Sequence, residues 1–188
     1  MIRSSILVSA AALICTVPAT AFAQVVIDYR TNGPAVGTTL VFKSSRGNTY
    51  TMTMESKTTF KSNTGSTAIK NSDGNSLRSG SRVFSPHSGY RPSNSGGALK
   101  VGQSWAHTYS VNGVRRIRRC RVERKGQYVN STVTVLGAFK VKCTNRRLDR
   151  QYPMNEEIWF TPNLFTELDY RATWGSSGGF SFQLIGVR

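Results

Sequence analysis

The residues that could carry binding chemistry in this 188-residue chain are concentrated in one basic run, residues 115–125. The run contains Arg115, Arg116, Arg118, Arg119, Arg121 and Arg124, and three further arginines, Arg146, Arg147 and Arg150, follow Cys143. A guanidinium group binds a phosphate or carboxylate group through two parallel hydrogen bonds, so the cluster predicts an anion-binding surface. The alternative is an exposed strand whose charges discourage edge-to-edge pairing with other chains and which has no specific ligand.

The basic run is expected to lie on a strand that follows a hairpin turn at Asn112–Gly113. Successive side chains of a strand point to opposite faces of the sheet. One face should then carry Arg116, Arg118, Cys120 and Val122, and the other face Arg115, Ile117, Arg119 and Arg121. Positive charge is therefore expected on both sides of the sheet.

Side chains with the chemistry of catalysis or metal binding are present, but their spacing suits neither. His107 stands between two aromatic residues of a predicted strand, which is typical of a histidine beside the core, and His87 is isolated in a loop. Glu156 and Glu157 are neighbours on a strand, so they face opposite ways and are poorly placed as a paired acid and base. The serines lack an ordered acid partner, and no C-x-x-C or phosphate-binding glycine motif occurs. We therefore expect a protein that is not an enzyme and that uses no cofactor or metal.

The first 23 residues have the pattern of an export signal. Arg3 precedes an almost wholly apolar stretch at residues 6–17, and Ala21-Phe22-Ala23 fits the A-x-A cleavage rule. The apolar stretch is about 12 residues long, whereas a bilayer-spanning helix needs about 20. We expect cleavage at Ala23-Gln24 and one periplasmic or secreted domain over residues 24–188, with no transmembrane segment.

Two other fates of the N-terminus are disfavoured. An uncleaved membrane anchor is disfavoured because the apolar stretch is short and is followed by a good cleavage site. Lipidation at Cys15 is disfavoured because the bulky Ile14 stands where a lipoprotein signal has a small residue.

After cleavage two cysteines remain, Cys120 and Cys143. An even number of cysteines in an oxidising compartment predicts a disulfide, here between residues 23 positions apart. A loop of that length would stabilise the fold by about 3 kcal/mol in the chain-entropy model. The alternatives are a redox pair or a metal site, although the two histidines lack ligand-like spacing.

The charge balance is strongly basic. The whole chain has 25 Lys and Arg against 9 Asp and Glu, a net charge of +16, and loss of Arg3 with the signal leaves about +15. Such a surface attracts polyanions over long range. For an exported protein these are lipopolysaccharide, anionic lipid, cell-wall polymers and extracellular nucleic acid. A basic surface without a specific partner is the alternative.

The elements that would position these residues are β-strands. Apolar and polar residues alternate with a period of two in several segments, for example residues 49–55 and 168–174. Gly126 and Gly137 are predicted to be turns that bound a strand over residues 128–136. Residues 71–97 are rich in Ser, Gly, Asn and Arg, and predict a long surface connection. The pattern favours a single all-β domain of about ten short strands, as an antiparallel curved sheet, a sandwich or an open barrel.

Several short motifs occur in a distinctive order: residues 37–42 (GTTLVF), 101–105 (VGQSW), 137–143 (GAFKVKC), 159–162 (WFTP) and 180–184 (FSFQL). In this order the chain resembles a group of small bacterial envelope proteins classed only as a domain of unknown function. That group has a pattern of G-T-x-W, vGxsW, a G-x-F hairpin and W-Y-x-P. The chain departs from it in lacking the usual Pro-Ala-Gly order before Phe139 and in having Phe160 in place of Tyr. The resemblance implies an exported antiparallel β-domain and supplies no catalytic residues.

Two functions remain open from the sequence. The first is a non-enzymatic envelope protein that contacts an anionic envelope component through its basic surface. The second is a periplasmic carrier of a lipid or another hydrophobic ligand inside a β-shell. An envelope hydrolase ranks below both because the required catalytic groups are missing.

Overall fold

Thirteen β-strands and no α-helix make up the part of the chain described by the computed structural model, residues 24–28, 33–92, 99–149, 153–164, 166–176 and 178–188. The predicted export signal, residues 1–23, and Arg150 lie outside the described residues. Within them, no helix has the length and apolar character needed to cross a membrane.

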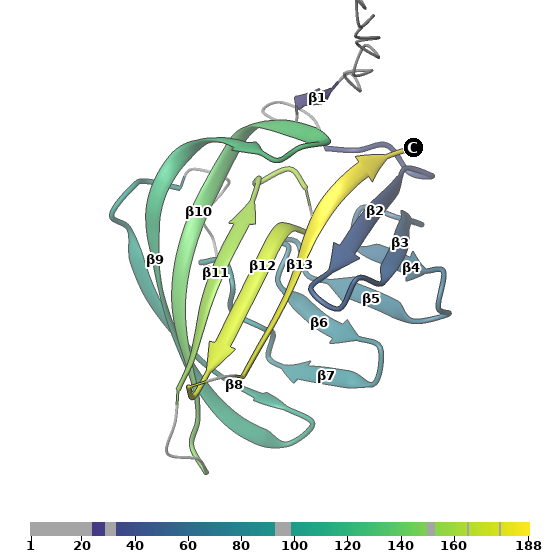
Figure 1. Ribbon diagram of the computed structural model, residues 1–188. Helices are drawn as coiled ribbons and strands as arrows, with labels where there is room; N and C mark the ends of the chain where they lie inside the picture. The colour runs from purple at the N-terminus through teal and green to yellow at the C-terminus, as the bar shows by residue number, and fades with distance from the viewer. Residues whose placement is uncertain (1–23, 29–32, 93–98, 150–152, 165, 177) are drawn as a thin grey trace, which may run out of the picture.

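Most strands follow one another with short turns, whereas residues 86–103 separate β7 from β8 (Figure 1). They are β1 (Val25–Asp28), β2 (Thr39–Ser44), β3 (Thr49–Met54), β4 (Thr59–Ser62), β5 (Thr67–Lys70), β6 (Ser76–Ser79), β7 (Arg82–Ser85), β8 (Ser104–Val111), β9 (Val114–Val129), β10 (Val133–Arg147), β11 (Met154–Phe160), β12 (Glu167–Trp174) and β13 (Gly178–Val187).

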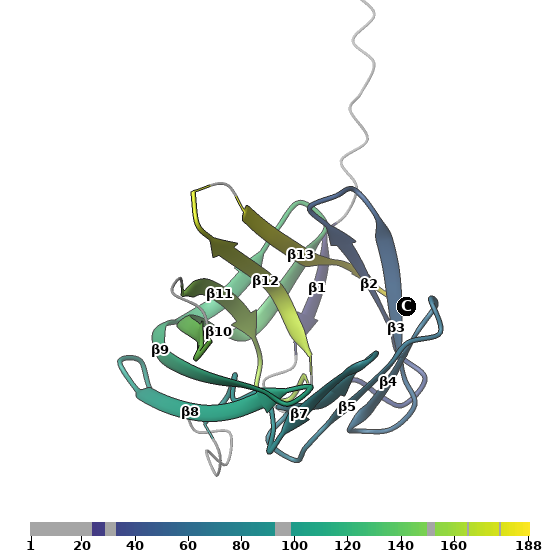
Figure 2. The same ribbon diagram turned by 90° about the horizontal axis from the view of Figure 1, so that it is seen from below.

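The sheet closes on itself. Strands β2 to β13 each pair antiparallel with the next strand in the chain, and β13 pairs antiparallel with β2. The result is an up-and-down barrel of twelve strands. Figure 2 shows it in a view down the barrel axis. β1 is an addition, because it pairs parallel with residues 133–136 of β10. The predicted all-β antiparallel single domain is confirmed, and the closed barrel replaces the sheet, sandwich and open-barrel alternatives.

One end of the barrel is filled by apolar side chains. The main core there includes Leu40, Phe42, Phe60, Leu164, Leu168 and Leu184, each with a relative exposure of 0%. A second cluster lies under β9 to β11 and includes Val122, Val141, Ile158 and Phe160 with the two cysteines. These positions alternate with exposed residues along their strands, as expected for a barrel wall.

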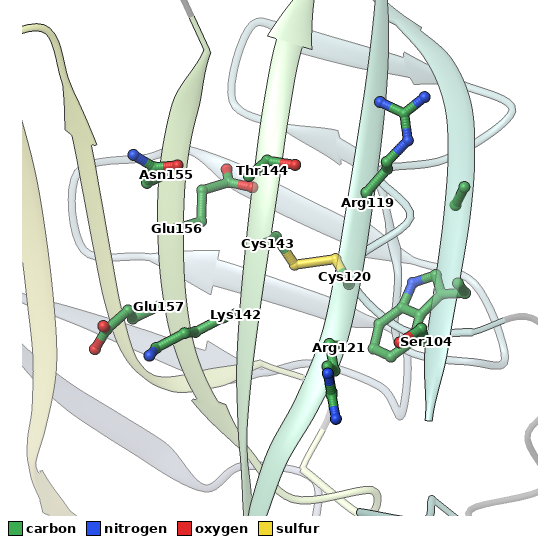
Figure 3. A pocket seen from close by; sticks show the side chains of 12 residues that line it. Ser104, Arg119, Cys120, Arg121, Lys142, Cys143, Thr144, Asn155, Glu156 and Glu157 are labelled. Atoms are coloured by element: carbon green, nitrogen blue, oxygen red, sulfur yellow. A yellow bond between two sulfur atoms is a disulfide. The ribbon is translucent and has the colours of Figure 1, made fainter. Parts of the chain in front are cut away.

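The predicted disulfide is confirmed. Cys120 on β9 lies directly opposite Cys143 on β10, with a Cα–Cα distance of 4.1 Å, and Figure 3 shows the bond between the two strands. Both residues are 4% exposed, so the bond lies within the second core cluster. It joins the two longest strands of the barrel four residues from the Arg116–Arg147 end of their pairing.

The prediction of a long surface connection over residues 71–97 is wrong for most of its length. The segment contains β6 and β7, which carry the sheet from β5 to β8. It then returns along the barrel, where Ser88 and Arg91 are 0% and 4% exposed. Its polar residues satisfy one another: the Asn75 side chain donates to the Arg91 carbonyl at 3.0 Å and accepts from the Arg91 N–H at 2.7 Å. Residues 93–98 lie outside the described part.

Candidate functional site

The arginines predicted to form one anion-binding cluster fall into three environments. Five are exposed on the outer face: Arg115, Arg119, Arg121, Arg124 and Arg146. Arg118 is 2% exposed and points into the barrel, whereas Arg116 is half-buried and lines an internal cavity. Arg147 is half-buried and donates to Asp149 at 2.7 Å. The predicted alternation of faces is therefore observed along β9, and it divides the cluster.

The outer arginines border a shallow hollow of about 670 Å³ across β8 to β11. Arg119, Arg121 and Lys142 line it, and Figure 3 shows these side chains around the disulfide. Two carboxylates neutralise part of this charge: Glu123 lies 3.3 Å from Lys142, and Glu157 lies 2.7 Å from Lys140. The outer hollow is thus basic, and it is open and partly neutralised.

Residues 114–121 of β9 pair with β8 on one side, and β9 pairs with β10 on the other, so this part of the strand is not an edge. The alternative in which charges discourage edge-to-edge pairing therefore does not apply to Arg115, Arg119 or Arg121, whereas Arg124 lies beyond the pairing with β8. The exposed arginines of the paired part need another explanation, either the solubility of a basic protein or contact with an anion.

The larger space is inside the barrel. A cavity of about 1160 Å³ extends from the middle of the barrel to the end formed by the β2–β3, β4–β5, β6–β7 and β8–β9 turns. We call the opening at this end the mouth; Arg46, Thr64 and Arg82 are exposed there. Part of the wall is aromatic or contains sulfur, with Tyr50, Met52, Phe84, Tyr109, Met154, Tyr170, Trp174, Phe180 and Phe182 as the principal residues, and most of the rest is serine, threonine or charged.

The aromatic side chains of the wall pack on one another. Phe182 stacks on Tyr170 with ring centroids 5.4 Å apart and contacts Phe180 at 6.0 Å. Tyr50 lies edge-on to Phe182 at 6.3 Å and stacks on Phe42 of the core at 5.3 Å. These contacts fix the shape of the wall, because rings held by several neighbours have few alternative rotamers.

The floor of the cavity is a buried polar network centred on Glu156, which is 1% exposed. Arg118 donates to its two oxygens at 2.8 and 3.1 Å, and the Tyr170 hydroxyl donates to Oε1 at 2.8 Å. The Arg118 guanidinium also donates to the Ser88 carbonyl and lies over the Tyr90 ring, 3.7 Å from its centroid. Arg118 and Tyr170 therefore hold the Glu156 carboxylate in a buried site, and Ser88 and Tyr90 in turn hold the Arg118 guanidinium.

Burial sets the protonation of the tyrosines in this floor. It raises the pKa of Tyr90 and of Tyr170 far above the usual value of a phenol, and the charge of Glu156 adds to the effect. Both phenols stay protonated at neutral pH. Tyr170 therefore acts as a hydrogen-bond donor to Glu156 and has no role as a base.

A second buried ion pair lies beside the first. Lys70 and Glu167, 5% and 9% exposed, are 3.5 Å apart. Although burial acts in the opposite direction, the charges of Lys70 and Arg91 hold the pKa of Glu167 below its usual value. Burial lowers the pKa of Arg91 to about 10, and its guanidinium donates to the Leu164 carbonyl at 2.7 Å.

The two histidines lie together on the inner side of β8. The rings of His87 and His107 stack with centroids 4.2 Å apart, and His107 Nε2 lies 3.0 Å from the His87 carbonyl oxygen. Gly89 has φ +66°, and a Cβ at that position would overlap the His107 ring. This packing agrees with the expectation of a histidine beside the core for His107, and shows that His87 is part of the same contact.

Three polar atoms that face the cavity are buried and have no hydrogen-bond partner among the described residues. They are Ser44 Oγ, Arg116 Nε and Asn145 Oδ1. A buried polar group without a partner costs about 1–3 kcal/mol, so such atoms mark places where a bound molecule gains most. Around the described residues, no group of three or more His, Cys, Asp or Glu side chains could hold a metal ion.

The sequence did not distinguish the cavity wall from core. Tyr50, Met52, Tyr170 and Phe182 alternate with outward residues just as packed core residues do. A signal was nevertheless present, because Arg116, Arg118 and Glu156 share the inward face with apolar neighbours. Charged residues on the buried face of a sheet indicate either a paired network or a lined cavity, and both occur here.

Comparison with known proteins finds neither a matching family model nor a matching curated protein. The resemblance to the envelope group therefore stays a prediction. Among solved structures, the hypothetical lipoprotein YmcC from Escherichia coli K12 is similar, with 12% identity, 81% of this chain and 85% of that chain covered, and a TM-score of 0.45. A protein from Parabacteroides distasonis ATCC 8503, also described as a lipoprotein, has 10% identity, 84% and 97% coverage and a TM-score of 0.42. At TM-scores below 0.5, function has to be argued from this chain itself.

Proposed function

We propose that this chain is an exported, non-enzymatic carrier that binds a lipid or another hydrophobic small molecule inside its barrel. The observation that supports the proposal is the cavity of about 1160 Å³ with its aromatic and methionine wall. Small-molecule sites are typically concave, of about 300–1,000 Å³, and lined mainly by hydrophobic and aromatic side chains with a few polar groups. The cavity is slightly larger than this range, and its aromatic and methionine residues share the wall with many serine, threonine and charged residues, which suits a lipid-sized ligand that has both an apolar and a polar part.

Filling the cavity tests the proposal. Ala172 on β12 lines the cavity and is 2% exposed, so Ala172→Trp places an indole in the ligand's space. Ala106 on β8 is exposed on the outer face, so Ala106→Trp is the matched control. The probe is Nile red, a neutral apolar dye that brightens in apolar sites. We expect unmodified protein and Ala106→Trp to bind it equally, and Ala172→Trp to bind it at least 10-fold more weakly.

Circular dichroism establishes that each variant is folded. Ser62→Trp, at a half-buried cavity position nearer the mouth, replaces Ala172→Trp if the latter does not fold. Equal Nile red binding by the inner and outer variants, or no binding by the unmodified protein, would show that the cavity is not a hydrophobic binding site.

A second candidate function, contact with an anionic envelope component, is favoured by the five exposed arginines on the outer face of the β9–β10 hairpin. Guanidinium groups there would bind the phosphates of lipopolysaccharide or anionic lipid, or the acidic groups of cell-wall polymers. The binding would be electrostatic, and it would therefore weaken as salt screens the charges.

The test compares two double variants of equal charge. Arg119→Gln with Arg121→Gln removes charge at the outer hollow, and Arg78→Gln with Arg171→Gln removes the same charge from exposed sites on β6 and β12. On an immobilised lipopolysaccharide column we expect the first pair to elute at a clearly lower salt concentration. Equal elution of both pairs would mean that net charge alone, and no specific surface, causes the retention.

A further inference from the structure

We infer that the ligand of the cavity is an anionic amphiphile, whose acidic head group is bound by Arg116 and whose hydrocarbon part lies against the aromatic wall. The inference rests on the proposed carrier function and names the chemical class of the ligand. It is independent of the outer arginines, because Arg116 is on the inner face of β9.

The charges that line the cavity are unbalanced. Five basic residues line it, Arg46, Lys70, Arg82, Arg116 and Arg118, against one acidic residue, Glu167. Two of the five are neutralised, Lys70 by Glu167 and Arg118 by Glu156. The other three, Arg46, Arg82 and Arg116, have no carboxylate within 4.0 Å among the described residues. A cavity with this excess attracts anions and repels cations.

Arg116 is the deepest of these three arginines. Arg46 and Arg82 are exposed at the mouth, whereas Arg116 is half-buried and its Nε atom is fully buried without a partner. Arg147, opposite Arg116 in the β9–β10 pairing, is bound by Asp149 at 2.7 Å, whereas none of the described carboxylates pairs with Arg116. Unlike the buried Nε, the terminal nitrogens of this half-buried side chain are available to a carboxylate or phosphate group of a ligand.

Asn145 provides an independent sign of a built head-group site. It is 3% exposed, lines the cavity and is the diagonal neighbour of Arg116 on the paired strands. Its Nδ2 donates to the Tyr109 hydroxyl at 2.9 Å, whereas its Oδ1 has no partner among the described residues. A donor at Arg116 and an acceptor at Asn145 suit a head group with an acidic oxygen next to a hydroxyl or amide N–H.

A purely apolar ligand fits this part of the cavity poorly. Its binding would strip water from the accessible part of the Arg116 guanidinium without replacing the lost hydrogen bonds, and would leave Asn145 Oδ1 without a partner, which is costly. An anionic head group restores those bonds, while Tyr50, Met52 and Phe182 cover the chain of the same molecule. One amphiphile would then contact both the polar part of the wall, at Arg116 and Asn145, and the aromatic part.

The experiment measures the affinity of three probes that share a twelve-carbon chain: dodecanoate, dodecyl phosphate and 1-dodecanol. Each is titrated into the mature protein by calorimetry below its critical micelle concentration. The variants are Arg116→Gln and, as a control that removes the same charge from an exposed site on β12 outside both the cavity and the outer hollow, Arg171→Gln. The first loses charge inside the cavity and the second loses it outside.

We expect the unmodified protein to bind at least one of the two anionic probes more tightly than 1-dodecanol. Arg116→Gln should weaken that binding by about 10- to 100-fold, as expected for loss of a charge-assisted hydrogen bond, and leave 1-dodecanol unchanged. Arg171→Gln should change the binding of none of the three probes. The stronger of the two anionic probes identifies the head group as a carboxylate or a phosphate.

The outcomes separate this inference from the proposed function. If 1-dodecanol binds as tightly as both anionic probes, or if Arg116→Gln weakens all three equally, the cavity is a hydrophobic site and the head-group assignment is wrong. If none of the three probes binds, and Nile red does not bind either, the carrier function itself is overturned.

Discussion

At the scale of single residues, the neighbours Glu156 and Glu157 show how one step along a strand separates two environments. The alternation rule predicted that they face opposite ways, and the structure confirms it: the Glu156 side chain is 0% exposed and that of Glu157 is 42% exposed. The rule could not predict what Glu156 meets. Its partner Arg118 lies 38 positions away in the sequence and was assigned to a surface patch.

Removal of the charge of Glu156 should therefore be far more damaging than removal of the charge of Glu157. Glu156→Gln leaves Arg118 buried without its counter-ion, and we expect the free energy of unfolding to fall by about 3–5 kcal/mol. Glu157→Gln breaks a largely exposed pair with Lys140 and should cost at most about 1 kcal/mol. Urea unfolding followed by circular dichroism measures both. Similar losses in the two variants would contradict the buried role of Glu156.

At the scale of elements, the regular strands could be predicted and the turns between the longest ones could not. The Asn112–Gly113 hairpin turn is confirmed, and Asn112 has the positive φ of 49° that favours Asn. The predictions of turns at Gly126 and Gly137 are wrong, since Gly126 lies inside β9 and Gly137 lies inside β10. The actual turn is at Asn130, whose side-chain oxygen accepts from the N–H groups of Thr132 and Val133. An Asx turn of this kind carries no glycine signal.

The packing of the segment from His87 to Arg91 could not be predicted from the sequence patterns. Its composition is polar, yet it packs against β8 and the cavity floor through both ring contacts and hydrogen bonds: His87 stacks on His107, and Tyr90 packs on the second core cluster. Trp105 Nε1 donates to the Gly89 carbonyl at 3.1 Å, and the Gly89 N–H donates to His87 Nδ1 at 3.1 Å. The second bond requires a neutral His87.

This segment should make stability depend on pH in the weakly acid range. Burial lowers the pKa of both histidines. The charge of His107 lowers the pKa of His87 further, while Asp73 acts in the opposite direction. For His107, the charge of Arg118 lowers the pKa further, while the hydrogen bond with the His87 carbonyl raises it. A histidine with a lower pKa in the folded state stabilises the fold while it is neutral, above the unfolded pKa of about 6.5. That contribution is lost as the pH falls below this value.

We expect the free energy of unfolding to decrease between pH 7 and pH 5.5. The double variant His87→Gln with His107→Gln should be less stable at pH 7 and should lose most of the dependence. Glu157 and Glu167 also have a lowered pKa, but their protonation changes the free energy of unfolding only below about pH 4.5, outside the range from pH 7 to pH 5.5. Urea titrations at both pH values provide the measurement. An unchanged slope in the double variant would assign the effect to other groups.

At the scale of the whole molecule, the number of strands determines whether there is a cavity. A barrel of eight strands is just filled by its own side chains, and wider barrels leave internal space. The sequence predicted about ten strands because the short, polar β6 and β7 lack the alternation that identifies a strand. These two strands widen the barrel, so the residues that were read as a loop help to create the binding space.

The sequence patterns also could not predict that the sheet closes into a barrel. The barrel closes through the pairing of β13 with β2, two strands more than 130 positions apart, for example Leu184 with Phe42. Hydrophobic alternation shows which face of each strand is buried but not which strands become neighbours across such distances. The fold class could therefore be predicted, whereas the interior that holds the candidate site required the structure.

The position of β1 has a practical consequence. It pairs with residues 133–136, at the opposite end of β10 from Asn145, and at about 3.3 Å per residue the stretch from Leu136 to Asn145 spans about 30 Å. A capture tag or fluorophore joined ahead of Val25 is thus attached far from the mouth. Single molecules immobilised through that end would keep the mouth towards the solution, so the residence time of a ligand can be recorded on the intact protein.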